Sequence, residues 1–138
     1  MADIDSTKKN LSQRELRDLD IEIDFLEGVL KRDRRYVEAL QLLGDDYTRR
    51  GRYKDGLQVD RRLARLCPDD PLVYYNLACS FSLIAEYRKA ANALRKAIQC
   101  GYRDFDHLRH DKDLAPLREQ SIYAGLEQEI IQLEAELD

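Results

Sequence analysis

Apolar residues recur every three or four positions along most of the chain, which is the spacing that places side chains on one face of an α-helix. In residues 13–32 this stripe consists of Leu19, Ile23, Leu26 and Leu30. The spacing predicts one long helix from about Gln13 to Arg32. Residues 1–12 carry no such stripe, and we expect them to form a frayed N-terminal tail.

An internal repeat of 34 residues occupies the middle of the chain. When the sequence is shifted by 34 residues, large residues meet large ones and small residues meet small ones: Leu40 meets Tyr74, Leu43 meets Leu77, Gly44 meets Ala78, Tyr47 meets Phe81, Gly51 meets Ala85, Tyr53 meets Tyr87, and Gly56 meets Ala90. We therefore expect residues 37–70 and 71–104 to fold into the same pair of helices.

The two copies meet at the sequence PDDP, residues 68–71. Proline fits the first turn of a helix, where its missing N–H loses no partner, and Asp is favoured just before that turn. Pro68 is therefore predicted to end the first copy. Pro71 is predicted to begin the next helix, with Asp69 and Asp70 as its caps.

The repeated pattern resembles the tetratricopeptide repeat. In its first helix a large residue is followed three positions later by Leu, then directly by Gly or Ala, and three positions later by an aromatic residue. Gly or Ala at the turn, Tyr, a small residue and a closing proline come after it. The resemblance covers roughly residues 19–118, with two departures. Asp60 stands where a large apolar residue is usual, and Tyr102 replaces the second closing proline. The resemblance implies an all-α fold, a short right-handed solenoid of antiparallel helical hairpins.

The same resemblance implies a division of the chain. After the tail we expect a repeat domain in residues 13–118, and then a C-terminal amphipathic helix in residues 119–138. The repeat domain is expected to contain a cap helix at 13–32, full repeats at 37–70 and 71–104, and a truncated terminal unit at 105–118.

The segment 121–138 predicts a helix with a heptad seam, because its apolar residues are spaced three and four apart. The seam consists of Tyr123, Leu126, Ile130, Leu133 and Leu137. The segment also carries five acidic residues and no Lys or Arg. Two interpretations are open: the helix caps its own chain on the helix that contains Leu94, or its seam pairs with a second copy to form a homodimer.

The resemblance further implies a non-catalytic protein that binds peptides or proteins on a concave face lined by the first helix of each repeat. Carried over position by position, this lining is Glu38, Gln41, Leu42, Asp45 and Arg49 from the first repeat and Leu72, Tyr75, Asn76, Cys79 and Leu83 from the second. Tyr75 and Leu83 are expected to serve as apolar anchors, and Asn76 is expected to hydrogen-bond a partner backbone.

One subfamily of these repeats binds a C-terminal carboxylate with Lys and Asn side chains on this face. Of the corresponding positions here only Asn76 matches, whereas Asp45 and Asp106 would repel a carboxylate. We therefore predict a partner of mixed apolar and basic character.

Charge and composition narrow the class of partner. The 138-residue chain has a formal net charge of −4, although residues 31–65 hold eleven Lys or Arg against six acidic residues. Acids interleaved with these cations, such as Asp45 and Asp55, favour pairing within the helices, so nucleic acid is not the expected partner. With no apolar stretch long enough for a signal peptide or a membrane span, we expect a cytoplasmic protein without a membrane partner.

Nothing in the sequence indicates an enzyme, and we expect neither catalysis nor a cofactor. Three scattered cysteines do not suggest a disulfide framework. A set of possible zinc ligands lies close together in sequence: Cys100, Asp106, His107, His110, Asp111 and Asp113. Its spacing matches no known ligand set, and polar residues of a repeat linker explain it equally well, so we predict no metal site.

Overall fold

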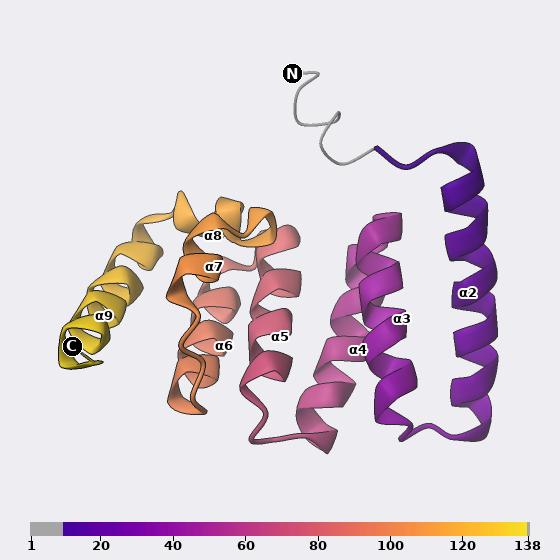
Figure 1. Ribbon diagram of the computed structural model, residues 1–138, viewed down its shortest axis with the longest axis horizontal. Helices are drawn as coiled ribbons and strands as arrows, with labels where there is room; N and C mark the ends of the chain where they lie inside the picture. Colours follow the sequence, from indigo (N-terminus) through magenta and orange to yellow (C-terminus); the bar gives the residue numbers. More distant parts are fainter. Residues whose placement is uncertain (1–9, 138) are drawn as a thin grey trace.

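The structure is a computed structural model and describes residues 10–137. Residues 1–9 of the expected tail, together with Asp138, lie outside the described residues. The elements are α2 (Gln13–Arg32), α3 (Val37–Arg50), α4 (Tyr53–Leu66), α5 (Pro71–Leu83), α6 (Tyr87–Gln99), α7 (Phe105–His110), the 3-10 turn η1 (Lys112–Leu114), α8 (Ala115–Arg118) and α9 (Ser121–Leu137). They stack from α2 at one end to α9 at the other (Figure 1).

No strand occurs between residues 10 and 137, so the predicted all-α fold is confirmed. The long helix α2 starts with a capping box, in which the Ser12 hydroxyl accepts from the Glu15 amide at 3.1 Å and the Glu15 carboxylate accepts from the Ser12 amide at 2.8 Å. Helix α5 starts at Pro71, and the Asp70 carboxylate accepts from the Leu72 amide at 2.9 Å. The predicted start at Pro71 is therefore present, and of the two predicted caps it is Asp70 that serves as the N-cap.

The two repeats form two helical hairpins, in which α3 packs on α4 and α5 packs on α6, while α4 also packs on α5. Gly44 lets α4 approach α3, because a Cβ at this position would lie 3.3 Å from Asp60 Oδ1 and 3.4 Å from Val59 Cγ1. Each hairpin reverses direction at a residue with positive φ, Gly51 at 86° and Ala85 at 64°. Small residues of the repeat pattern therefore mark a helix crossing and a turn.

Buried apolar side chains form two clusters. One cluster joins α2, α3 and α4 and extends to Val73 of α5. The other runs from Leu57 of α4 to Ile130 of α9. Ala64 of α4 packs against both clusters, so the array is continuous rather than divided into two separate parts.

Helix α9 packs on α6 and α8 of its own chain. Leu126 and Ile130 have no exposed surface, Tyr123 is also buried, and Leu133 is half-buried. Most of the predicted seam is therefore not available to a second copy in this arrangement, because its surface is already covered within the chain. Of the five predicted seam residues only Leu137 is exposed, at 64%.

Arg109 of α7 makes a second set of contacts with α9, through hydrogen bonds to two glutamates. Its guanidinium donates to Glu127 Oε2 at 2.8 Å and to both carboxylate oxygens of Glu134, at 2.7 and 2.8 Å. These charge-assisted bonds stabilise the acidic helix against the terminal unit. In the part of the chain that the structure covers, no helix is both long enough and apolar enough to cross a bilayer.

Candidate interaction groove

A groove runs along the face formed by the first helices of the repeats, α3 and α5, and by the terminal unit. Its inner part is a cavity of about 320 Å³, which we call the acidic pocket. The acidic pocket is lined by Gly44, Asp45, Thr48, Arg49, Asp60, Tyr75, Asn76, Cys79, Ser80, Leu83, His107, Asp111 and Asp113. These residues come from α3, α4, α5, α7 and η1 with the residue before it, so the site exists only when the repeats and the terminal unit stack.

The acidic pocket brings together six of the ten residues predicted for the concave face: Asp45, Arg49, Tyr75, Asn76, Cys79 and Leu83. The other four predicted residues are exposed but line no part of this cavity: Glu38, Gln41, Leu42 and Leu72. They lie nearer the start of α3 and α5, whereas the terminal unit covers the later turns.

Tyr75 and Cys79 are not the accessible groups that the sequence suggested. Both are buried, with 4% and 8% of their surface exposed. The Tyr75 ring stacks on Tyr102 at 4.5 Å between centroids, and its hydroxyl donates to Asp111 Oδ2 at 2.7 Å. The terminal unit folds over α5 and covers these side chains, so Tyr75 positions the wall of the pocket rather than offering an exposed anchor.

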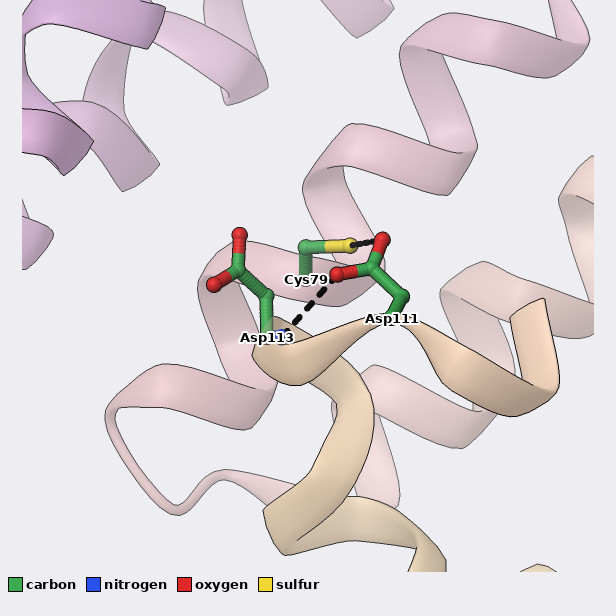
Figure 2. A group of neighbouring side chains, drawn as sticks. All are labelled: Cys79, Asp111 and Asp113. Carbon is green, nitrogen blue, oxygen red and sulfur yellow. Dashed lines mark hydrogen bonds between the residues drawn. The ribbon is translucent and has the colours of Figure 1, made fainter. Parts of the chain in front are cut away.

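Cys79, Asp111 and Asp113, which all line the acidic pocket, lie together (Figure 2), with potential ligand atoms within 4.8 Å of one another. Asp111 Oδ1 accepts from the Asp113 amide at 3.0 Å, and Oδ2 accepts from the Cys79 thiol at 3.8 Å. His107 Nε2 is 3.3 Å from the same Oδ2. Of the zinc candidates named from the sequence, this group therefore gathers Asp111, Asp113 and His107 around Cys79.

The hydrogen bonds that Asp111 accepts account for the proximity of these side chains. Burial raises the pKa of the Cys79 thiol well above its usual value, and the nearby Asp111 carboxylate raises it further. Asp111 already joins α5 to η1, so we assign the cluster a structural role.

Burial also acts on two carboxyl groups of the pocket. It raises the pKa of Asp60 to about 7, against the opposing effect of the hydrogen bond that the Ser80 hydroxyl donates to this carboxyl. Burial likewise raises the pKa of Asp45, while the neighbouring Arg49 lowers it. Asp60 is buried, whereas Asp45 is exposed at the rim, and neither carboxyl group has a close ion pair among residues 10–137.

The groove continues into a larger cavity of about 1100 Å³, which we call the apolar pocket. The two pockets share Thr48, Arg49, Leu83 and Asp113. Apolar parts of the lining come from Leu11, Leu16, Tyr53, Leu83, Tyr87, Ala115 and Pro116, and charged parts come from Arg49, Arg50, His110, Lys112, Asp113, Arg118 and Glu119. We call the two pockets together the inner groove.

Several lining residues were not predicted as site residues. Asp60 could have been singled out from the sequence, because it replaces an apolar residue of the repeat pattern. His107 and Asp111 were noticed only as possible zinc ligands and not as lining of the groove, because their position depends on how the terminal unit folds back on α5.

Comparison with known proteins agrees with this geometry. The sequence model of the tetratricopeptide repeat matches residues 37–78. Residues 37–78 are therefore a tetratricopeptide repeat, within a helical array of the same kind. The crystal structure of MamA superposes on this chain with a TM-score of 0.60 and 29% sequence identity, covering 75% of this chain and 67% of that chain.

A curated relative is a chloroplastic protein from Arabidopsis thaliana, which is 29% identical over 86 residues. The match covers 60% of this chain and 26% of the relative, so this chain spans only a minor part of that protein's length. The family and the fold together make this chain a protein-interaction repeat module, a class that is generally non-catalytic.

Proposed function

We propose that the inner groove is the surface through which this module binds a peptide segment of a partner protein. The observation that carries the proposal is the continuity of the two pockets across α3, α5 and the terminal unit. Such a groove offers apolar walls for side chains and polar groups that fix orientation, the combination typical of binding sites. Asn76 is exposed at its edge, where its amide can donate to and accept from a partner backbone.

A matched pair of variants tests the proposal. Asn76→Arg adds a long cation inside the groove, whereas Gln58→Arg adds the same side chain at an exposed position of α4 outside it. Proteins captured from native cells by the wild-type chain are quantified by mass spectrometry against both variants. We expect specific partners to be lost with Asn76→Arg and retained with Gln58→Arg, and equal recovery with both variants contradicts the proposal.

Self-association through α9, the alternative considered from the sequence, has less support. The residues of its seam that remain exposed or half-buried are Leu133 and Leu137, and Ile131 on the neighbouring face adds a further exposed apolar side chain. Analytical ultracentrifugation over a wide concentration range tests this alternative, which a constant monomer mass contradicts. The cytoplasmic location also stays a prediction, to be tested by fractionation of native cells.

A further inference from the structure

We infer that the inner groove selects a partner segment with one basic side chain, which enters the acidic pocket, next to apolar side chains that enter the apolar pocket. This inference rests on the proposed function and names the chemistry of the partner. It is carried by the distribution of charge along the groove and by the unequal linings of the two pockets.

The acidic pocket carries more negative than positive groups. Carboxyl groups enter it from α3, α4 and the start of η1: Asp45, Asp60, Asp111 and Asp113. The basic side chains are Arg49 and His107. His107 faces Asp111 at 3.3 Å. Arg49 also lines the apolar pocket and makes no ion pair within 4.0 Å with Asp45 or Asp60, although its charge lowers the pKa of Asp45.

Burial strengthens the attraction of the acidic pocket for a cation. Asp60 is buried beneath the pocket, and its pKa is raised because its ionised form is poorly solvated. Asp45 is exposed, and partial burial of its carboxyl group raises its pKa as well. A guanidinium or ammonium group that enters the pocket stabilises those ionised forms, since Coulomb attraction is stronger where water is excluded. An acidic side chain in the same place would meet repulsion and further loss of solvation.

The apolar pocket has the opposite charge at its edge. Its cations include Arg49, Lys112 and Arg118, and Arg118 donates to the Leu108 and Asp111 carbonyls at 2.9 and 2.8 Å. A second basic residue of the partner would be repelled here. The half-buried side chains of Leu16 and Leu83 instead offer apolar contact, so the groove orients the segment with its basic residue toward α5 and Asn76.

A displayed library of random peptides, selected on the full chain, tests this inference. We expect enriched peptides to carry a single Arg or Lys beside apolar residues. An enriched Arg peptide is then synthesised together with a copy in which citrulline, neutral and of nearly the same shape, replaces the arginine. Fluorescence anisotropy should show the arginine form binding at least about tenfold more tightly.

Two variants assign this difference to the groove. Asp45→Asn removes a carboxylate of the acidic pocket, and Asp55→Asn removes one from α4 that pairs with Arg52 outside the groove. The preference for arginine over citrulline should shrink in Asp45→Asn and persist in Asp55→Asn. Circular dichroism confirms that both variants remain folded.

The outcomes separate the inference from the proposed function. Leu83→Glu places a carboxylate where the two pockets meet and so disrupts the apolar contact of the groove without adding a cation. If binding is lost in this variant but arginine and citrulline peptides bind the wild type equally, the inference is overturned and the proposed function stands. If enriched peptides bind Leu83→Glu as well as the wild type, or if no peptide is enriched, both are overturned.

Discussion

The two full repeats fold into the same helical hairpin, yet equivalent positions hold different chemistry. Position 60 of the first repeat is Asp, and position 94, which lies 34 residues later, is Leu. Both are buried, at 7% and 0% exposure. Leu94 is covered by apolar neighbours of the larger core, whereas Asp60 accepts a hydrogen bond from Ser80 of the next repeat.

The difference shows that this repeat position requires burial with satisfied neighbours rather than an apolar residue as such. Asp60 also lines the acidic pocket, whereas Leu94 lies in the core away from the inner groove. The departure from the repeat pattern therefore falls on the groove side of the array. Substitutions at equivalent positions of the two repeats test this reading.

The largest effect is expected at Leu94. Leu94→Ala removes a fully buried side chain and leaves a cavity, so the free energy of unfolding should fall by about 2–5 kcal/mol. Urea unfolding followed by circular dichroism measures it. Leu42→Ala, at an exposed leucine of α3, is the matched control and should change stability by no more than about 0.5 kcal/mol. A small loss at Leu94 would mean that the core relaxes around the gap.

The next effect concerns pH and Asp60. Its pKa is raised to about 7 in the folded chain, so the native state binds this proton more tightly than the unfolded state does. Its contribution is fully present below the unfolded pKa of about 4 and is lost as pH rises through the folded pKa, by on the order of 3–4 kcal/mol. Stability should therefore decrease from about pH 4 to about pH 7 and change little above that.

Asp60→Asn should flatten much of this dependence, as measured by urea unfolding at several pH values. Some dependence should persist, because burial and the neighbouring Glu22 raise the pKa of Asp46 to about 7 as well. Asp55→Asn, at a carboxylate paired with Arg52 on the surface, should leave the slope unchanged. An unchanged slope in Asp60→Asn contradicts the assignment.

A smaller and opposite pair of effects is expected at the hairpin turns. Gly51 and Ala85 occupy equivalent positions, and both have positive φ. Since glycine adopts this conformation without strain, Ala85→Gly should stabilise the chain by about 1 kcal/mol, and Gly51→Ala should destabilise it by a similar amount. Thermal melts of the two variants give the signs, and equal signs would show that the two turns are not equivalent.

The smallest effect is expected at Arg50, where the first repeat uses an exposed ion pair and the second repeat uses an apolar contact. Arg50 pairs with Asp20 of α2 at 2.8 Å, and its equivalent in the second repeat is Ile84, which packs on the larger core. Arg50→Ala should cost about 0.5 kcal/mol or less, because exposed ion pairs contribute little. Ile84→Ala should cost about 1–2 kcal/mol in the same urea titration.

The fold could be predicted from the sequence because the signals that define each repeat are local. The 34-residue spacing, the capped start at Pro71 and the small residues at Gly44 and Gly51 each act within one hairpin or between adjacent ones. The residues that line the inner groove could be predicted only in part. Asn76 and Leu83 follow from helical phase, but His107 and Asp111 belong to a unit without repeat register, whose contacts depend on its path over α5.

By itself, the sequence determined that α9 has a buried face, because its apolar residues are spaced for one side of a helix. It did not determine what covers that face, since the same stripe suits a neighbouring helix of the chain or a second copy. Only the tertiary structure decided this, by placing α6 and α8 against Leu126 and Ile130 and Arg109 beside Glu127. Local spacing specifies that a surface is removed from water, whereas its partner depends on which distant segments fill the space beside it.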